Sequence, residues 1–278
     1  MLAGMDAPLD NLRAHLLTMP PVEVLYTDLD GTLLGPGGSL LTAPDGSPTL
    51  RTAAAIVAAR EAGVTVVPVS GRRHLTLAAD ARLMGLRDAI AEAGTVLVRD
   101  GTVSFVWGEA PTTEGETPRD ALTRSGALDA LLSAFPRDLR VFLPWDEGRI
   151  GEILLHGRVD VAAANRVVAD AGAPWSCVID NGRASSAWDG REAHAYHLLP
   201  RGTGKARAVA AHLAARPTPP QRALAVGDSL EDLTMAAVVG TYVQVANGHG
   251  EVSGNAFTVP GAMGEGFADA VDALLAAR

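Results

Sequence analysis

The chain has 278 residues, of which 47% are hydrophobic and 20% charged, so it can form one large domain or two moderate ones around a buried core. Its net charge of −9 argues against a general nucleic-acid-binding protein, which needs a basic face, and no apolar run of about 20 residues predicts a membrane span. The single cysteine excludes an intramolecular disulfide.

The N-terminal part of the chain alternates between helical and strand-like segments. It lacks the pattern of a secretory signal, so we expect a cytoplasmic protein. Apolar spacing and the positions of Pro and Gly predict a helix over residues 9–18, a strand over 22–26, a helix over 49–62 and a strand over 64–69. The second strand is apolar throughout, as expected for a strand that is buried on both faces of a parallel sheet.

The middle of the chain, from about residue 85 to 195, is less regular. Its strand-like pieces are residues 95–98, 103–107, 139–143, 153–156, 177–179 and 193–198. Two helical pieces lie among them, over residues 121–134 and 159–171. This mixture predicts an α+β insert within a larger domain.

The C-terminal part returns to a regular alternation. Its predicted elements are a helix over 205–215, a strand over 222–226, a helix over 230–238, a strand over 242–245 and a helix over 265–277. Alternation of this kind predicts an α/β fold, with a Rossmann-like doubly wound parallel sheet and right-handed crossovers.

Polar residues follow three of the predicted strands. Asp28 and Asp30 follow the first, Ser70 the second, and Asp228 and Asp232 the strand over 222–226. In an open parallel sheet, ligands bind beyond the carboxyl ends of the strands, so we expect these side chains to converge. Four carboxylates in one place repel one another unless a cation neutralises them, and oxygen ligands without His or Cys indicate Mg²⁺. The residue types therefore predict metal-assisted phosphoryl chemistry.

Four segments, in order along the chain, resemble the motifs of a known family. They are Asp28-Leu29-Asp30-Gly31-Thr32, Ser70-Gly71-Arg72, Lys205 and Gly227-Asp228-Ser229-Leu230-Glu231-Asp232. This set resembles motifs I to IV of the haloacid-dehalogenase-like superfamily. The resemblance implies a Mg²⁺-dependent phosphatase that forms an aspartyl-phosphate intermediate.

The position of the insert, between Ser70 and Lys205, resembles that of a C2 cap. Together with Ser70-Gly71-Arg72, it resembles the type IIB or Cof-like branch, which includes sucrose-phosphate and mannosyl-3-phosphoglycerate phosphatases. The resemblance predicts a catalytic core over residues 1–84 and 196–278. A cap over 85–195 would select the substrate, which we expect to be a small sugar or polyol phosphate.

The resemblance also implies a role for each motif residue. The implied nucleophile is Asp28, and the implied acid and base is Asp30. Thr32 and Ser70 would donate hydrogen bonds from their hydroxyl groups, and Lys205 would supply a positive charge. Contacts to the substrate or its phosphate are implied for Gly31, Gly71, Arg72 and Asn247. The implied metal ligands are Asp28, the carbonyl of Asp30, Asp228 and Asp232, the last either as a ligand or as a partner of one.

Some positions leave alternatives open. Ser70 could instead cap a helix, and Asp30 could act only through its charge. Glu231 and Ala93 stand where relatives commonly have Asn, which puts the substrate in question. Several polar or aromatic residues could line the cap without any one of them being assigned: Arg72, Trp145, His156, Asp180, Arg183, Trp188, Asp189 and His194.

Three functions compete. The leading one is a phosphatase acting on a small molecule, with no nucleic-acid or membrane partner, as a monomer or homodimer. A phosphomutase of the same branch would have to keep its aspartyl-phosphate from water. A non-catalytic sugar-phosphate sensor would have to lose activity while retaining every motif residue.

Overall fold

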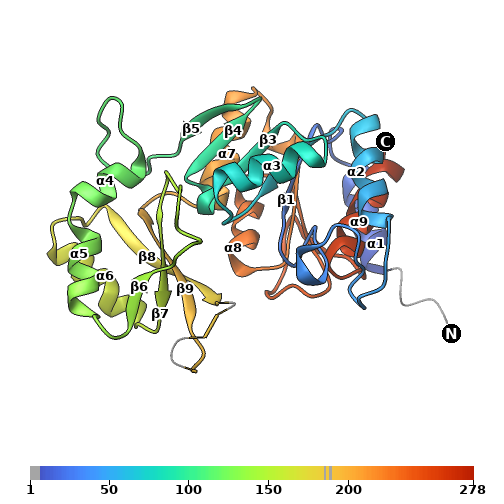
Figure 1. Ribbon diagram of the computed structural model, residues 1–278. Coiled ribbons are helices and arrows are strands. Elements are labelled where there is room, and N and C mark those ends of the chain that lie inside the picture. The colour runs from blue at the N-terminus through green and yellow to red at the C-terminus, as the bar shows by residue number, and fades with distance from the viewer. Residues whose placement is uncertain (1–6, 185, 188–189) are drawn as a thin grey trace.

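The structure is a computed structural model that describes residues 7–184, 186–187 and 190–278. Figure 1 shows two lobes, each built on its own β-sheet, with α1 and the C-terminus in the larger lobe. Among the described residues, the strand order is β12-β11-β10-β1-β2-β3-β4-β5 in the large sheet and β6-β7-β9-β8 in the second. None of the helices in these ranges is long and apolar enough to span a bilayer.

The large sheet is parallel except at one edge. Its strands are β1 (Val24–Asp28), β2 (Thr65–Val69), β3 (Asp88–Ala91), β4 (Val96–Arg99), β5 (Thr102–Phe105), β10 (Ala223–Gly227), β11 (Thr241–Gln244) and β12 (Ala256–Thr258). β1 lies between β10 and β2 and is parallel to both. β4 and β5 add an antiparallel hairpin beside β3. The predicted doubly wound sheet is therefore confirmed.

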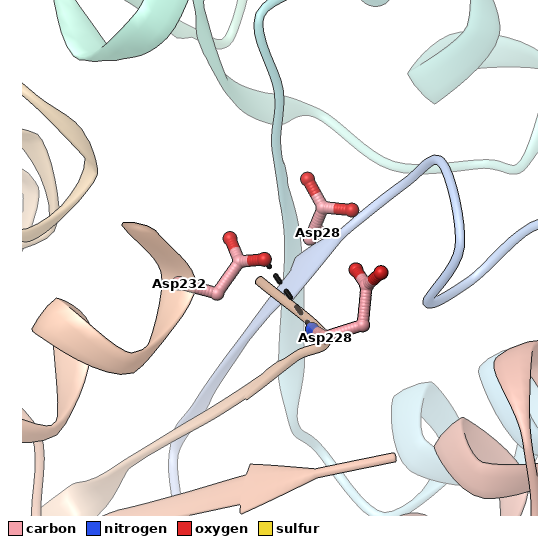
Figure 2. A group of neighbouring side chains, drawn as sticks. All are labelled: Asp28, Asp228 and Asp232. Carbon is pink, nitrogen blue, oxygen red and sulfur yellow. Dashed lines mark hydrogen bonds between the residues drawn. The ribbon is translucent and has the colours of Figure 1, made fainter. Parts of the chain in front are cut away.

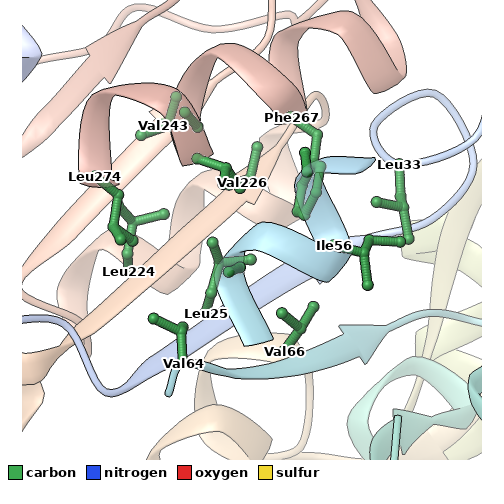
Figure 3. Packing of buried hydrophobic residues seen from close by; sticks show 14 of the residues in the cluster. Leu25, Leu33, Ile56, Val64, Val66, Leu224, Val226, Val243, Phe267 and Leu274 are labelled. Carbon is green, nitrogen blue, oxygen red and sulfur yellow. The ribbon is translucent and has the colours of Figure 1, made fainter. Parts of the chain in front are cut away.

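Helices cover both faces of the large sheet because its strands are apolar on both sides. On one face lie α1 (Ala7–Leu16), α2 (Arg51–Glu61), α3 (His74–Leu83) and α9 (Met263–Ala276). On the other lie α7 (Lys205–Ala215) and α8 (Leu230–Leu233). Side chains alternate along β1, with Leu25 packed in the first cluster and Val24 and Tyr26 in the second. Figure 3 shows Leu25 with Ile56 and Phe267 in the first cluster.

The second sheet is antiparallel and has helices on one face. Its strands are β6 (Leu139–Val141), β7 (Ile153–Gly157), β8 (Ser176–Arg183) and β9 (His194–Pro200). Helices α4 (Pro118–Arg124), α5 (Ala127–Ala134) and α6 (Val161–Asp170) cover it. On β9, Tyr196 and Leu198 pack into the core beneath these helices, whereas Ala195 and His197 line a cavity towards the large sheet. The period of two thus produces one apolar face and one cavity-facing face.

Two differences from the predicted elements concern the insert. The expected helix over 121–134 is two helices, because Gly126 has φ of +75° and interrupts it. Strands β3, β4 and β5 belong to the large sheet, although residues 85–105 were expected in the insert, because β3 pairs with β2 and extends that sheet. At the other end, β9 continues the second sheet to Pro200. We therefore propose that the insert begins after β5 and ends with β9.

Candidate active site

The three predicted strand ends meet at one edge of the large sheet. β10, β1 and β2 are neighbours, so Asp228, Asp28 and Ser70 follow one another across that edge. All three line a cavity of about 810 Å³ between the two lobes. The expected convergence of these side chains is therefore what the structure shows.

Lys205, the first residue of α7, joins two of the carboxylates. Its Nζ donates hydrogen bonds to Oδ1 of Asp28 and Oδ1 of Asp232, each at 2.7 Å, and all three side chains are buried. Burial opposes the charge of Lys205, but the two carboxylates outweigh it and raise the pKa of the ammonium group. Lys205 therefore stays protonated, as a group that neutralises an anion must.

The electrostatic surroundings of Asp28 differ from those of Lys205. Burial raises the pKa of its carboxyl group to about 7, against the attraction of Lys205 and with the help of Asp232 and Asp228. Burial likewise raises the pKa of Asp228, although Thr32 donates a hydrogen bond to it. One lysine therefore does not compensate the carboxylates gathered here.

A metal ion fits this group of carboxylates. Asp28, Asp228 and Asp232 each offer an oxygen within 4.8 Å of the others, and Figure 2 shows the three side chains around a common space. The donors are all hard oxygens, which suit Mg²⁺. Asp28 and Asp228 come from neighbouring strand ends, so the fold itself brings them together.

Asp232 is already engaged by protein groups. Its Oδ2 accepts hydrogen bonds from the hydroxyl and the backbone N–H of Ser229, and its Oδ1 accepts from Lys205. Ser229 in turn caps α8 through its hydroxyl. Asp232 was expected to be either a metal ligand or a partner of one. This arrangement favours the second role, in which Asp232 holds Lys205 and the loop after β10 in place.

The loop after β1 packs against Asp228. Thr32 is fully buried and its Oγ1 donates to Oδ1 of Asp228 at 2.8 Å. Gly31 has φ of +92°, and a Cβ there would lie 2.7 Å from Oδ2 of Asp228. The structure thus uses Thr32 to orient Asp228, whereas the sequence predicted a hydrogen bond from its hydroxyl to phosphate.

Asp30 and Arg72 form an ion pair in the lining of the cavity. Arg72 donates from Nη2 to Oδ1 of Asp30 at 2.6 Å and from Nε to Oδ2 at 3.0 Å. Its Nη1 donates to Asp80 at 2.8 Å. The side chain of Asp30 is 57% exposed. Arg72, which was expected to bind phosphate, is therefore paired with Asp30, the expected acid and base.

The Ser70-Gly71 turn has no helix-capping role. The N-cap residue of α3 is Arg73, so the alternative in which Ser70 caps this helix is wrong. Ser70 lines the cavity and its Oγ accepts a hydrogen bond from the N–H of Arg72 at 3.2 Å. Gly71 also lines the cavity, and its carbonyl accepts a hydrogen bond from Arg149 at 2.9 Å.

Asn247 does not belong to the cavity lining, contrary to its expected phosphate contact. Its Nδ2 donates to the carbonyl of Gly31 at 2.8 Å, and its Oδ1 accepts from the N–H of Met263 at 2.7 Å. Both polar atoms are used in joining the loop after β1 to the start of α9. Asn247 therefore supports the position of the catalytic loop.

The expected cap residues divide into three groups. Trp145 and Arg183 line the cavity, with Arg72 from the large lobe. The other described candidates, His156, Asp180 and His194, are outside its lining. Trp188 and Asp189 lie outside the described residues.

Among the cap residues that line the cavity, Arg149 and His197 were not among the candidates expected from the sequence. His197 is buried, and its Nδ1 lies 2.5 Å from Oε2 of Glu152. The alternation along β9 was the available signal, because His197 falls between the apolar residues Tyr196 and Leu198. That signal shows which face His197 occupies but not what the face covers.

Comparison with known proteins gives related folds and one curated relative by sequence. No family model matches the chain. A curated phosphoglycolate phosphatase from Methanothrix thermoacetophila is 28% identical over 257 residues, which cover 92% of this chain and 98% of the relative. Because this likeness spans nearly the whole of both chains, it includes the insert as well as the sheet that carries the site.

Solved structures agree in fold over both lobes. A protein from Thermoplasma acidophilum matches with a TM-score of 0.66 at 18% identity, covering 92% of this chain and 99% of that one. A haloacid dehalogenase-like hydrolase from Bacteroides thetaiotaomicron matches with a TM-score of 0.63 at 14% identity, over 90% and 98%. The sucrose-phosphatase from Synechocystis, solved with sucrose and phosphate, matches with a TM-score of 0.62 at 14% identity, over 92% and 98%. The large lobe, which carries the candidate site, and the second lobe therefore occur together in these proteins.

Proposed function

We propose that this chain, which shares its fold with haloacid dehalogenase-like hydrolases, is a Mg²⁺-dependent phosphomonoester hydrolase of that group with Asp28 as its nucleophile. The observation that carries the proposal is the buried pairing of Lys205 with Asp28, beside Asp228, at the end of the central strand. A carboxylate held by a lysine and facing a cavity is placed to attack an electrophile that carries negative charge.

In the first step, an oxygen of Asp28 attacks phosphorus while the bond from phosphorus to the ester oxygen breaks. Oδ1 of Asp28 accepts the hydrogen bond from Lys205, whereas Oδ2 accepts none among the described residues and is free to attack. Asp30, in its protonated form, gives its proton to the leaving oxygen. The products of this step are an alcohol and an aspartyl-phosphate on Asp28.

In the second step, water attacks the phosphorus of the aspartyl-phosphate. Asp30, now ionised, accepts a proton from this water, and the bond to Asp28 breaks to release inorganic phosphate. Asp30 is protonated again and Asp28 is free, so the cycle closes. For either step, the pairing of Asp30 with Arg72 has to loosen enough for its carboxyl group to reach the reacting oxygen.

Two cavity-lining groups support the transferring phosphoryl group. The ammonium of Lys205 neutralises charge on its oxygens, which is the largest contribution in most phosphoryl transfers. The hydroxyl of Ser70 donates a hydrogen bond to one of them. The resident Mg²⁺, held by Asp28, Asp228 and the carbonyl of Asp30, would supply the remaining charge compensation.

The substrate is a small molecule because the insert covers the site. The cavity of about 810 Å³ is of a size that suits a metabolite. Among the relatives, one is named for phosphoglycolate, the phosphate ester of a carboxylic acid. Another was solved with the sugar sucrose and with phosphate. We propose a sugar or polyol phosphate, on the chemistry of the cavity described below.

Two other functions make different predictions for the same residues. A phosphomutase would transfer the phosphoryl group and release little inorganic phosphate from simple esters. A sugar-phosphate sensor would bind such esters without turnover. Release of inorganic phosphate with multiple turnovers distinguishes the phosphatase from both.

The proposal is tested with p-nitrophenyl phosphate in the presence of Mg²⁺. We expect hydrolysis with multiple turnovers, and a decrease in kcat of at least about 10²–10³-fold for Asp28→Asn, because the amide cannot attack phosphorus. The exposed Asp45→Asn, outside the cavity, is the matched control and should leave kcat unchanged. Equal rates for wild type and Asp28→Asn would remove Asp28 from the mechanism.

A further inference from the structure

His197 lines the cavity and has a buried ring nitrogen, Nε2, that has no hydrogen-bond partner among the described residues. The residue is 1% exposed and lies on the cavity-facing side of β9, paired in register with Leu154 of β7. Leaving a buried polar atom without a partner is costly, and native structures seldom do so without a reason.

Glu152 determines which ring nitrogen carries the hydrogen. Its Oε2 lies 2.5 Å from Nδ1 of His197, and a carboxylate can only accept, so Nδ1 donates. The guanidinium of Arg149 donates to the other carboxylate oxygen and so neutralises the charge of Glu152. In a neutral ring with its hydrogen on Nδ1, Nε2 is a hydrogen-bond acceptor.

Nε2 is directed to the catalytic side of the cavity. A Cβ on Gly71 would lie 3.6 Å from Cε1 and 3.7 Å from Nε2 of His197, so this edge of the ring faces the turn that follows β2. Ser70, which neighbours Gly71, lines the same cavity beside Asp28. An ester bound with its phosphorus at Asp28 would place its leaving group between this turn and the cap.

Within this region, one acidic side chain disfavours an anionic group beside it. Glu231 lines the cavity, and its carboxylate accepts no hydrogen bond from the described residues. Glu231 and the unpartnered Nε2 of His197 are thus two acceptors, and both require a donor. Hydroxyl groups supply such donors, whereas a carboxylate on the leaving group would meet the negative charge of Glu231.

We propose that Nε2 of His197 accepts a hydrogen bond from a hydroxyl group of the leaving group. His197 thereby selects phosphate esters of polyols or sugars over alkyl esters, while the charge of Glu231 disfavours phosphorylated carboxylic acids. This inference rests on the proposed phosphatase function and extends it to the class of substrate. Glu152 and Arg149 act through His197, because they hold the ring and its hydrogen in place.

The test compares three kinds of ester with the same number of carbons. Glycerol 3-phosphate has hydroxyl groups, n-propyl phosphate has none, and 3-phosphoglycerate has a carboxylate; sorbitol 6-phosphate, n-hexyl phosphate and 6-phosphogluconate form a second, larger set. For at least one set, we expect wild-type kcat/KM to be roughly tenfold or more higher for the polyol ester than for either analogue. The alkyl ester leaves the buried acceptor on His197 without a donor, and the carboxylate ester brings a negative charge towards Glu231.

His197→Asn tests the residue itself. Its amide can still donate to Glu152 but leaves nothing at the position of Nε2, so we expect the preference for the polyol ester over the alkyl ester to fall to about twofold or less, mainly through KM. His197→Gln places an amide oxygen near Nε2 and should restore part of the preference. If His197→Asn does not fold, as judged by its thermal unfolding, His197→Gln and the wild-type series still test the proposal.

His74→Asn is the matched control. His74 is also buried, and its Nδ1 also lies close to a glutamate, Glu92, at 2.7 Å, but it does not line the cavity. We expect this variant to keep the wild-type preference. A wild-type enzyme that favours the alkyl or carboxylate esters in both sets, or a preference unchanged in His197→Asn, would overturn the proposal.

The same assays separate this inference from the proposed function. If p-nitrophenyl phosphate is hydrolysed with Mg²⁺ but the preferences do not depend on His197, only the role of His197 fails. If wild type hydrolyses no phosphate ester at all, the phosphatase function fails and the selection of substrate fails with it.

Discussion

At Asp28, burial and two neighbouring carboxylates oppose ionisation while Lys205 favours it, and the pKa rises to about 7 as a result. The unfolded chain would ionise the same group near pH 4. Between these two values the folded protein binds more protons than the unfolded chain, so its stability falls as the pH rises through this range. Mg²⁺ bound between Asp28 and Asp228 would remove this effect by compensating the charge.

This balance predicts how the metal-free protein responds to pH. In the presence of a chelator, we expect the melting temperature of wild type to fall from pH 5 to pH 8 more steeply than that of Asp28→Asn, which has no proton to lose at this position. Differential scanning fluorimetry across this range measures the two slopes. Parallel slopes would show that Asp28 ionises in the folded protein as it does in the unfolded chain.

Gly31 provides a second prediction at the scale of one residue. Alanine there would be strained at φ of +92°, by about 1–2 kcal/mol, and its Cβ would displace the carboxylate of Asp228. We expect Gly31→Ala to raise the Mg²⁺ concentration for half-maximal activity by roughly 10–100-fold, the range seen when the support of a metal ligand is lost.

Gly46→Ala is the control for strain alone. Gly46 has φ of +87°, and a Cβ there would meet nothing within 4 Å. This variant should lose stability without changing the Mg²⁺ requirement. A similar Mg²⁺ requirement for both variants would mean that contact with Asp228 is not what keeps position 31 a glycine.

Single residues differ in how far the sequence could predict their contacts. Asp28, Ser70 and Asp228 could be placed together because each follows a strand of one parallel sheet. Asn247 could not be assigned in the same way, because its partners, Gly31 and Met263, are distant in sequence and bind through their backbone. His197 was given no role because its partner Glu152, which lies just before β7, is distant in sequence.

At the scale of elements, Glu92 connects α3 to the segment that precedes β7. Its carboxylate is fully buried and accepts four hydrogen bonds. The donors are the N–H and Nδ1 of His74 and the backbone N–H groups of Ile150 and Gly151. This one side chain thus ties the large lobe to the part of the insert that carries Arg149.

Glutamine cannot replace Glu92 in this position. One pair of donors would face its amide nitrogen, which is itself a donor, so we expect Glu92→Gln to lower the free energy of unfolding by about 1–3 kcal/mol. Urea denaturation measures the change. Glu251→Gln, at an exposed site, should alter stability little; equal effects of the two substitutions would show that the four hydrogen bonds contribute no net stability.

The elements themselves were predictable where helices separate the strands. Strands β1, β2, β10 and β11 were expected because apolar runs alternate with helical spacing. β4 and β5 were expected as strands but not as part of the large sheet, since a hairpin resembles the antiparallel pieces of the insert. Only the pairing of β3 with β2, a contact distant in sequence, shows where they belong.

At the scale of the whole molecule, the cavity depends on both lobes. Asp28, Ser70 and Lys205 come from the large lobe, whereas Arg149 and His197 come from the second. The sequence could predict this division because the insert separates Ser70 from Lys205. It could not predict which cap side chains face the cavity, because that depends on how the second sheet is oriented over the first.

Binding of Mg²⁺ should stabilise the folded molecule as a whole. An ion that binds the folded state alone adds about 2.7 kcal/mol at 100 times its dissociation constant, so we expect Mg²⁺ to raise the melting temperature of wild type. Asp228→Asn removes one charged ligand and should reduce this increase. An equal increase in both proteins would place the ion elsewhere.

The most direct test of the central claim is to identify the phosphorylated residue during turnover. Acid quenching of the enzyme with substrate and Mg²⁺, followed by peptide mass spectrometry, should find a phosphoryl group on Asp28. With p-nitrophenyl phosphate, whose leaving group departs without a proton from Asp30, its amount should increase in Asp30→Asn, where water is no longer activated. A phosphoryl group on another residue, or none in either protein under conditions of rapid turnover, would contradict Asp28 as the nucleophile.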